Sequence, residues 1–525
     1  MLDRSLLAPH AVAVWAQKTP DALALVHVDG EQLTYAELLA DSYLWATCLR
    51  RLGVDAGSHV ATLLPNIFDA HRTMLALGWL RAVEVPLNVA YVGEILRHAL
   101  TLSEATTLIT TKALLPQVNA VASELPLLRT VLLVDAPAPA EGPLTTLSLP
   151  EELADTTAET DFEGPEVTDV STLMFTSGTT GPSKAVISPW GLTYQMWSWV
   201  PDDMLAPGEA LYSAMSLVHN SGRSGFSYVL SRGACLVTRD KFSATSVWDD
   251  VRRFGCVALA LVGPLTALLY SAPPRDDDAD NPVRSVILGP MIPQIADFEQ
   301  RFGVHVAICY GQTEIGAPVT SGWDHGPWEA CGRRRLSWPY HEVRIVDDND
   351  QALPPGQVGE MVVRSDEAGA LNLGYYGMPD RTAEAWRGGW FHTGDAFRED
   401  DDGNFYFVDR MNDAIRRRGE NISSFEVEAA VALHPAVREC AAIGVRTEFG
   451  DDEVMAVVIV DDPAFAPSEL LAFLSSRLPV FMLPRYVDVV SDLPRNATTG
   501  RVRKSELRAA GVTASAWDAA SNQPG

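Results

Sequence analysis

Short apolar runs and longer amphipathic segments alternate through the first half of this 525-residue chain. Residues 58–65 form an apolar run, residues 66–82 have helical periodicity, and residues 83–88 are apolar again. Strands and helices in such regular alternation indicate βαβ units, because parallel strands must be joined by crossover segments. The pattern therefore predicts an α/β protein with largely parallel sheets.

The pattern changes in the second half of the chain. From about residue 343, short strands are separated by Gly and Asp turns, which predicts a small antiparallel β-rich subdomain. Beyond Arg410 the chain becomes α+β, with a helix expected at 423–434 and a strand at 453–460. We therefore predict a large N-terminal domain of βαβ-type sheets plus the β-rich subdomain, followed by a small mobile α+β C-terminal domain. Their expected bounds are 1–410 and 411–525.

Two further segments need their own interpretation. Residues 136–170 are rich in Pro, Thr and Glu and are interpreted as a surface connection. The stretch from Phe254 to Pro274 carries no charge and comes closest to a membrane span, but Gly263 and Pro264 divide it. A buried strand, a turn and a helix fit this stretch better.

The charge balance limits the partners. The chain has 68 Asp and Glu against 40 Lys and Arg, a formal net charge of −28. Sequence-independent binding to nucleic acid and docking on an anionic membrane both need clustered basic residues, so neither is expected. The six cysteines are scattered without a CxxC pair, and the N-terminus lacks the features of a signal peptide. Reduced thiols in a cytoplasmic protein are the expectation.

The segment STLMFTSGTTGPSKAV at 171–186 carries the strongest chemical signal. A buried strand from Thr172 to Phe175 is expected to lead into a loop of Thr, Ser and Gly that contains Lys184. Glycines let backbone N–H groups face a ligand, hydroxyls add donors, and the ammonium group adds a compact charge. This combination suits a polyphosphate, although the spacing is not that of a Walker P-loop.

This loop resembles the phosphate-binding loop of the AMP-forming adenylating enzymes, which include acyl- and aryl-CoA synthetases, luciferases and nonribosomal peptide adenylation domains. Further segments resemble motifs of that family in the same order: LTYAELLADS at 33–42, YGQTE at 310–314, GYYGMPDRT at 374–382, FHTGD at 391–395 and DRMNDAIRRRGENISSFEVE at 409–428. The likeness covers nearly the whole chain, and the acyl-CoA synthetases of the crotonobetaine/carnitine-CoA ligase-like type are the most similar branch.

The resemblance implies ATP, Mg²⁺ and CoA as cofactor and co-substrates. Asp395 would bind both ribose hydroxyls, Glu314 would hold Mg²⁺, and Thr313 would contact the α-phosphate. Tyr310 would stack on adenine opposite Gly289 and Pro290, and Arg410 would add a donor to the ribose. The remaining nucleotide-binding residues would be Thr176, Ser177, Gly178, Thr179, Thr180, Lys184, Gly311 and Gln312.

The implied reaction has two steps. A carboxylic acid attacks the α-phosphorus of ATP, which gives an acyl-adenylate and pyrophosphate, and the thiol of CoA then displaces AMP. The catalytic residues would be Arg501, Thr313, Glu314 and His219. The protein would act as a monomer or homodimer on a small-molecule acid.

The C-terminal region departs from the family pattern. In TTGRVRKSELR, Arg501 stands at the position of the family's adenylation lysine, and Lys504 is the alternative three residues on. Asn412 occupies the hinge position, where the family usually has Asp or Lys. Arg418, followed by Gly419, lies where a glycine is common beside the channel for CoA.

The acid pocket would be built from His219, Asn220, Gly222, Arg223 and Met291. An Arg223 that points inward would favour a substrate with a second anionic or strongly polar group, whereas one that points outward would be a surface charge. The Gly and Ser residues around it favour a small, aromatic or carnitine-like polar acid over a long-chain fatty acid.

Two other functions stay open. An adenylating enzyme could pass the acyl group to a carrier protein or an amine, or could activate an unusual acid such as nitrite, as the ATP-dependent diazotases do. An inactive nucleotide-binding relative is disfavoured because Lys184, Glu314, Asp395 and Arg410 are all present.

Overall fold

The structure is a computed structural model of residues 1–525. It describes all of them except 1, 140, 177–182, 290–294, 325, 337, 348, 411–414, 419, 423, 448–449, 463–464, 496–501, 503 and 522–525, together with the side chains of 264, 267, 408–410, 421, 425 and 505. The chain forms two compact units. The first comprises Met1–Val89, Leu100–Phe175 and Ala185–Asp409, and the second comprises Ala90–Ala99, Thr176–Lys184 and Arg410–Gly525.

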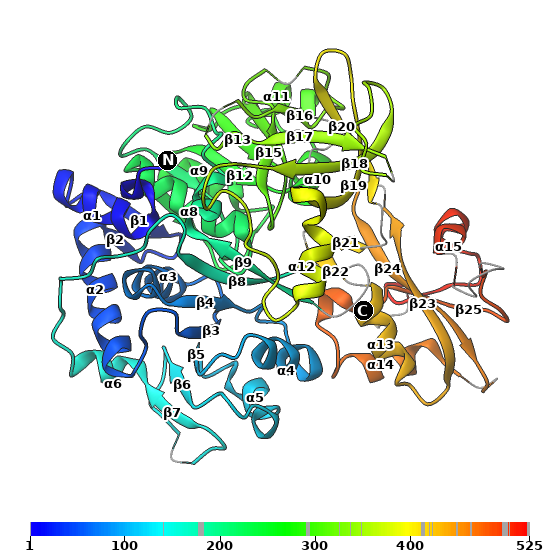
Figure 1. The fold of residues 1–525 in the computed structure, drawn as a ribbon, viewed down its shortest axis with the longest axis horizontal. Helices are drawn as coiled ribbons and strands as arrows, with labels where there is room; N and C mark the ends of the chain where they lie inside the picture. The colour runs from blue at the N-terminus through cyan, green and yellow to red at the C-terminus, as the bar shows by residue number, and fades with distance from the viewer. Residues whose placement is uncertain are drawn as a thin grey trace. The chain divides into compact units, whose positions relative to one another are not determined.

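A seven-stranded sheet carries the first βαβ units (Figure 1). Its order is β7-β6-β5-β3-β4-β8-β9, and the pairs from β7 to β8 are parallel. The strands are β3 (His59–Leu63), β4 (Val83–Pro86), β5 (Thr107–Thr110), β6 (Thr130–Leu133), β7 (Thr145–Ser148), β8 (Val170–Thr176) and β9 (Lys184–Pro189). The apolar runs at 58–65 and 83–88 thus become neighbouring parallel strands, as predicted.

A thirteen-stranded sheet forms the rest of the first unit, in the order β17-β18-β19-β20-β16-β15-β14-β13-β12-β10-β11-β1-β2. Its parallel part holds β1 (Leu23–His27), β10 (Ala210–Tyr212), β11 (Cys235–Thr238), β12 (Cys256–Leu261), β13 (Ser285–Leu288) and β14 (His305–Gln312). Its antiparallel strands are β2 (Gln32–Thr34), β15 (Gly316–Thr320), β16 (Gly332–Arg334), β17 (Glu342–Val346), β18 (Val358–Arg364), β19 (Phe391–Glu399) and β20 (Asn404–Arg410). The antiparallel region expected from about residue 343 is confirmed.

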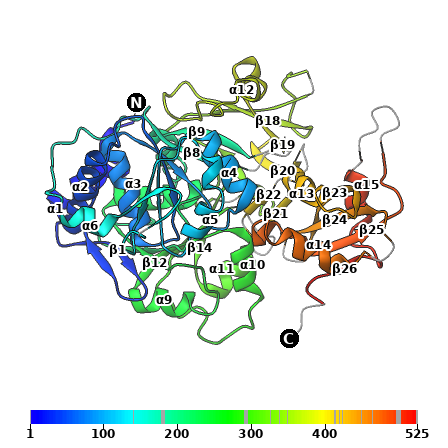
Figure 2. The ribbon, with the colours of Figure 1, turned by 90° about the horizontal axis from the view of Figure 1, so that it is seen from below.

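Helices connect the strands of the first unit, and Figures 1 and 2 show α2 and α3 side by side. Helix α2 begins with a capping box, in which Thr34 and Glu37 satisfy each other's backbone N–H groups. The helices are α1 (Ala8–Lys18), α2 (Tyr35–Arg51), α3 (Phe68–Leu80), α5 (Leu115–Asn119), α6 (Leu149–Ala154), α7 (Trp190–Gln195), α8 (Asn220–Arg232), α9 (Val247–Phe254), α10 (Gly263–Ser271), α11 (Ile295–Phe302) and α12 (Pro379–Ala385). Among the described residues, no helix is both long and apolar enough to cross a membrane.

The second unit contains a four-stranded sheet and a hairpin. The sheet has the order β23-β24-β25-β26, and β21 pairs with β22. The strands are β21 (Ile415–Arg417), β22 (Glu420–Ile422), β23 (Val437–Arg446), β24 (Asp452–Val460), β25 (Tyr486–Val489) and β26 (Trp517–Asp518); the helices are α13 (Ser424–Ala432), α14 (Pro467–Leu474) and α15 (Lys504–Ala510). Most of α4 (Gly93–Leu102) also belongs to this unit.

The predicted secondary structure differs from the structure mainly at residues 136–170. This segment was expected to be a surface connection, but it contains β7 and α6. Strand β7 lies at the edge of its sheet and is buried at only one of its four residues, so its sequence carries little apolar alternation. The charge-free stretch from Phe254 to Pro274 forms β12 and α10, which confirms the interpretation as strand, turn and helix.

A buried ion pair joins the seven-stranded sheet to α8. Arg223 of α8 is 1% exposed and Glu84 of β4 is 4% exposed, and their nearest side-chain atoms, Nη2 and Oε2, lie 2.6 Å apart. Thr62 of β3 donates to the other carboxylate oxygen at 2.8 Å. Since two charges buried together are stable only as a pair, this contact fixes where α8 begins against the sheet.

Arg418 has an unusual backbone conformation. Its φ of 52° lies in the left-handed region, which favours glycine. The backbone N–H of Arg418 donates to Asp451, and its side chain, 73% exposed, lies 3.5 Å from Glu453. The hydrogen bond to Asp451, which directly precedes β24, thus helps to hold a conformation that a side chain normally disfavours.

Removal of one partner of the buried pair is expected to destabilise the first unit strongly. Glu84→Ala leaves the Arg223 guanidinium buried without a counter-charge, so the free energy of unfolding should fall by about 3–5 kcal/mol. Equilibrium urea unfolding measures this change. The exposed pair Arg284–Glu209 provides the control, because Arg284→Ala should cost less than about 1 kcal/mol. Equal losses in the two variants would contradict the structural role of the buried pair.

At Arg418 the backbone, rather than the side chain, is expected to decide stability. Arg418→Ala keeps the unfavourable φ, whereas Arg418→Gly removes it, so the glycine variant should be more stable than the alanine variant by about 1 kcal/mol. Thermal unfolding of the two variants measures the difference. A glycine variant that is less stable than the alanine variant would show that the backbone at this position is not strained.

Candidate active site

Two residues of the YGQTE motif, Tyr310 and Gln312, meet Asp395 of the FHTGD motif. Its Oδ2 accepts hydrogen bonds from the Tyr310 hydroxyl at 2.8 Å and from Gln312 Nε2 at 2.8 Å. Tyr310 and Gln312 end β14, whereas Asp395 lies 85 and 83 residues further on, in β19. The ring of Phe397, two residues beyond Asp395, packs against Tyr310 with the ring centres 4.6 Å apart. Strands β14 and β19 thus hold a carboxylate beside an aromatic ring.

Glu314 is held in the tight turn between β14 and β15. Its side chain is 9% exposed, and the Tyr375 hydroxyl donates to Oε1 at 3.2 Å. The backbone oxygen of Glu314 accepts two bonds from Asn372, each 2.9 Å long. Burial and the neighbouring Glu314 carboxylate raise the pKa of Tyr375, so Tyr375 stays a hydrogen-bond donor at neutral pH. The carboxylate is therefore fixed in position before any ligand binds.

The glycine of the YGQTE motif has a steric role. A Cβ atom on Gly311 would lie 2.3 Å from the backbone oxygen of Gly316, so β14 and β15 approach each other too closely for a side chain. Thr313 follows in the turn and is half-buried. The motif therefore owes its glycine to packing, and its Tyr, Gln and Glu to the polar cluster.

The ends of the predicted phosphate loop belong to the second unit. Thr176 is the last residue of β8 and Lys184 the first of β9. The Oγ1 atom of Thr176 is buried and has no hydrogen-bond partner among the described residues. Buried hydroxyls normally have a partner, so this atom suits a ligand oxygen such as that of a phosphate. Ser177, Gly178, Thr179 and Thr180 lie outside the described residues.

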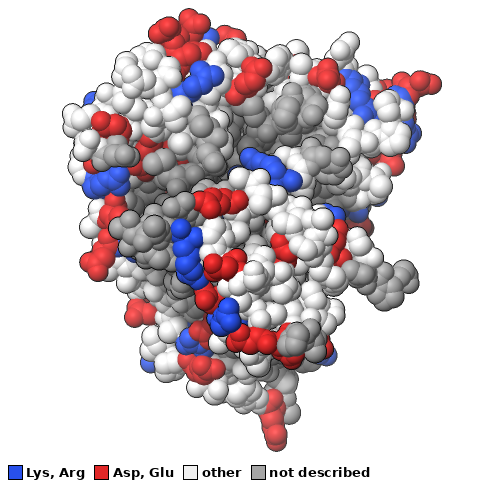
Figure 3. Space-filling view, turned by 90° about the vertical axis from the view of Figure 1, so that its right-hand side faces the viewer, with Lys and Arg blue, Asp and Glu red and all other residues white. Residues whose placement is uncertain are grey.

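The charged side chains on one face of the molecule do not gather into a basic patch. On the face drawn in Figure 3, acidic and basic side chains are interspersed among uncharged residues. With a net charge of −28, the protein as a whole repels a polyanion. Binding of ATP therefore needs local donors and a cation. Mg²⁺ is a hard cation that takes oxygen ligands, so the Glu314 carboxylate would fit it and the ion would supply the positive charge.

Several other predicted residues can be placed only in part. Gly289 directly follows β13, and Arg410 ends β20 with its side chain not described. The positions outside the described residues are Pro290, Met291, Asn412, Gly419 and Arg501.

The predicted acid pocket falls at the start of α8. His219 is the N-cap residue, and Asn220 is buried with no partner for its Nδ2 among the described residues. A Cβ atom on Gly222 would lie 2.2 Å from the backbone oxygen of Ser216, so the preceding turn approaches the helix closely. Arg223 points inward, which is one of the two directions left open by the sequence. Because Glu84 balances its charge, an inward Arg223 does not by itself favour a second anionic group on the acid.

Lys504 is already engaged within the second unit. Its Nζ donates to Ser424 Oγ at 2.7 Å and lies 2.6 Å from Glu428 Oε1, and both residues belong to α13. These contacts tie α15 to α13. The ammonium group of Lys504 therefore has a structural function.

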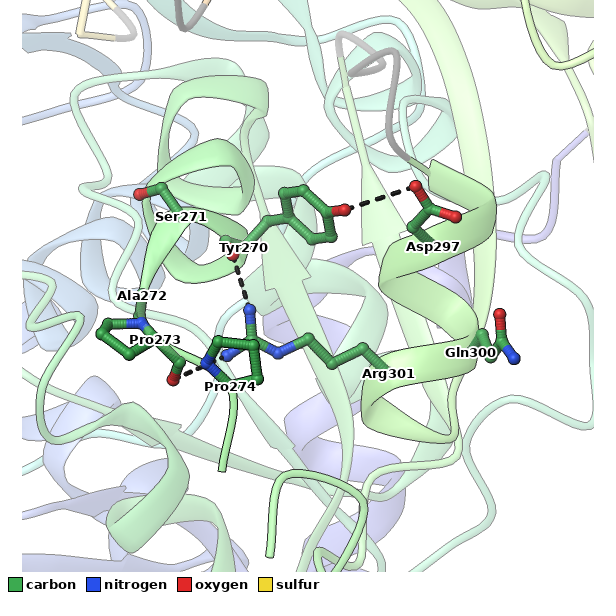
Figure 4. Close-up of a pocket in the computed structure, with 8 residues that line it drawn as sticks. All are labelled: Tyr270, Ser271, Ala272, Pro273, Pro274, Asp297, Gln300 and Arg301. Atoms are coloured by element: carbon green, nitrogen blue, oxygen red, sulfur yellow. Dashed lines mark hydrogen bonds between the residues drawn. The ribbon is translucent and has the colours of Figure 1, made fainter. Parts of the chain in front are cut away.

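The hollow drawn in Figure 4 has a volume of about 500 Å³ and lies between α10 and α11. Arg301 in its wall donates to Asp278 and to the backbone oxygen of Tyr270, and the Tyr270 hydroxyl donates to Asp297. The lining residues belong to none of the motifs, and these charged groups are already partnered. We assign no part of the reaction to this hollow.

Two carboxylates with specific partners were not predicted from the sequence. Glu84 interrupts the apolar run VEVP, and a charge inside a buried strand is a signal for a buried partner. Glu426 lies inside the motif at 409–428 and accepts two hydrogen bonds from Ser183. Ser183 and Glu426 are 243 residues apart, so no local sequence pattern indicates their contact.

Comparison with known proteins bears on both parts of the chain. Residues 12–376 match the family described as AMP-binding enzyme, and residues 426–499 match the AMP-binding enzyme C-terminal domain. The crotonobetaine/carnitine–CoA ligase of Salmonella agona is 27% identical over an alignment of 512 residues, which covers 94% of this chain and 96% of the relative.

Solved structures show the same fold. An o-succinylbenzoate–CoA synthetase from Bacillus subtilis is 25% identical with a TM-score of 0.82, over 95% of this chain and 98% of the other. An amide bond synthetase from Marinactinospora thermotolerans is 25% identical with a TM-score of 0.81, over 95% and 99%.

These findings confirm the predicted α/β fold class and the predicted resemblance. They also confirm the predicted enzyme class, an AMP-forming acid–CoA ligase with ATP, Mg²⁺ and CoA as cofactor and co-substrates. The first family match spans well over half of the sequence. The chain belongs to the AMP-binding enzyme family.

Proposed function

We propose that this enzyme activates a small, aromatic or polar carboxylic acid with ATP and transfers the acyl group to CoA. The observation that carries the proposal is the cluster at Asp395, where Tyr310 and Gln312 from one motif meet a carboxylate from another. An aromatic ring beside a fixed carboxylate is the arrangement that a nucleoside needs, because the ring can stack on the base while the carboxylate binds ribose hydroxyls.

In the first step, a carboxylate oxygen of the acid attacks the α-phosphorus of ATP. The bond from this phosphorus to the bridging oxygen breaks, and pyrophosphate leaves with the electron pair. Lys184 and the hydroxyl of Thr176 bind the leaving phosphates, and Thr313 contacts the α-phosphate. Glu314 would hold Mg²⁺, which would supply positive charge for the phosphoryl oxygens. The Tyr375 hydroxyl keeps the Glu314 carboxylate in place.

In the second step, the thiolate of CoA attacks the acyl carbon and AMP leaves. We propose that residues 1–410 form the adenylation domain and that residues 411–525 form a mobile domain with its hinge at Asn412. Rotation of this domain would exchange an adenylating face for a thioester-forming face. A cytoplasmic location and a monomer or homodimer complete the proposal. The six cysteines, none of them in a disulfide, support a reducing compartment.

Arg501 is proposed as the cation that replaces the family's adenylation lysine. The contacts of Lys504 with Ser424 and Glu428 support this choice, because that ammonium group is already used to join two helices. A guanidinium keeps the positive charge and can contact carboxylate and phosphate oxygens together.

The ion pair between Arg223 and Glu84 bears on the acid. A second carboxylate on the substrate would meet a guanidinium whose charge is already balanced. We therefore propose a monocarboxylic acid, with its tail near His219 and Asn220 at the start of α8.

A second acceptor is the alternative function. The likeness to an amide bond synthetase favours an amine as the acceptor in place of CoA. Arg418 also stands where the family commonly has glycine beside the CoA channel, and its side chain is largely exposed. A carrier protein or nitrite chemistry remains the more distant alternative.

A survey of acids tests the proposed function. The enzyme is incubated with ATP, Mg²⁺ and single acids, with and without CoA, and pyrophosphate and AMP are measured. We expect pyrophosphate release with a monocarboxylic acid and sustained AMP formation only with CoA. Turnover that does not need CoA but needs an amine would establish the alternative. No release above background with any acid would indicate an inactive relative.

Removal of the two candidate cations is expected to have different effects. Arg501→Ala should lower the rate of ATP–pyrophosphate exchange by about 10²- to 10³-fold, because it removes a charge that acts in the transition state. Lys504→Ala should retain exchange within about threefold but lower the unfolding temperature, because it separates α15 from α13. Normal exchange in Arg501→Ala, or loss of exchange in a folded Lys504→Ala variant, would refute the assignment.

A further inference from the structure

Ser183 is held at all three of its polar groups. Its backbone N–H and its hydroxyl both donate to Glu426 Oε1, at 2.8 and 2.5 Å. Its backbone oxygen accepts a hydrogen bond from His98 Nε2 at 3.0 Å. The residue is only 4% exposed. These contacts lie within the second unit, which joins residues of α4, the segment before β9 and α13.

Glu426 lies in the first turn of α13 and is half-buried. Burial raises its pKa, and the two bonds from Ser183 and the nearby His98 oppose this effect. A carboxylate with reduced access to water relies on such donors to remain charged. The bonds to Ser183 are therefore an essential part of the environment of Glu426.

Because of where Ser183 lies in the sequence, these bonds affect the backbone of the next residue. It directly precedes Lys184, the lysine of the segment that resembles a phosphate-binding loop. Fixing the N–H, the hydroxyl and the C=O of one residue fixes the peptide plane that leads to the next. The direction in which Lys184 leaves the backbone is thus set at Ser183.

We propose that Glu426 is a positioning residue for the phosphate-binding lysine, because it holds Ser183 and thereby the backbone that carries Lys184. This inference rests on the proposed function, in which Lys184 binds the phosphates of ATP.

A neighbouring carboxylate on the same helix has a different task. Glu428 accepts from the backbone N–H of Ala442 at 2.8 Å and pairs with Lys504 at 2.6 Å. These bonds attach α13 to β23 and α15. Glu428 therefore secures the helix itself, which leaves Glu426 to act on Ser183, and it provides a matched control.

Calorimetry first measures the affinity of the enzyme for a non-hydrolysable ATP analogue in the presence of Mg²⁺. Glu426→Ala should raise the dissociation constant about tenfold, because the bonds from Ser183 to a charged acceptor are lost. Glu426→Gln should raise it less than about threefold, since its amide oxygen can still accept both bonds. Glu428→Ala should leave the constant unchanged although it lowers the unfolding temperature.

The second measurement is a double-mutant cycle with Ser183→Ala. The double variant should bind the analogue no more weakly than Glu426→Ala alone, within about twofold, because both substitutions interrupt one contact. Hydrogen exchange gives a readout independent of the nucleotide. The amide of Ser183 should exchange faster in Glu426→Ala than in the wild type, and at the wild-type rate in Glu428→Ala.

These results separate the inference from the proposed function. If the wild type binds the analogue and Glu426→Ala binds it weakly, the inference holds even when no acid yields pyrophosphate. If acids are activated but folded Glu426→Ala binds the analogue like the wild type, the inference fails and the function stands. The inference would also fail if Glu426→Ala and Ser183→Ala raised the dissociation constant by independent factors. It would fail as well if the amide of Ser183 exchanged at the wild-type rate in Glu426→Ala.

Discussion

The buried pair of Glu84 and Arg223 is the contact on which the arrangement of the first unit depends. It links a strand of the seven-stranded sheet to α8, which connects β10 and β11 of the thirteen-stranded sheet. Two charges this deeply buried admit one geometry, because any shift leaves both of them unpaired in a medium of low polarity. The start of α8, and with it His219 and Asn220, is therefore placed by electrostatics as well as by apolar packing.

The acidity of the protein shapes how it can bind ATP. A net charge of −28 opposes a polyphosphate at long range, so attraction must arise at short range. In the proposed function, this attraction comes from Thr176, whose hydroxyl has no partner among the described residues, from Lys184, and from Mg²⁺ that Glu314 would hold.

The few lysines of the chain serve different purposes. Only five occur among the 40 basic residues. Lys184 follows a residue whose backbone is fixed by Glu426 and His98, whereas Lys504 joins two helices. Sequence spacing offered both Arg501 and Lys504 for the adenylation step, and the contacts of Lys504 favour Arg501. Because lysines are few, the sequence narrows the choice to Arg501 and Lys504, but only the contacts of Lys504 favour one of the two.

Local periodicity and the fixed order of the motifs were enough to predict the α/β class, the antiparallel region from about residue 343 and the family. It missed β7, whose half-exposed residues carry little pattern. Two contacts came to light only in the folded chain: Arg223 pairs with Glu84, 139 residues away, and Tyr310 meets Asp395 across 85 residues. Such pairs are set by how sheets and helices pack, which no local pattern records.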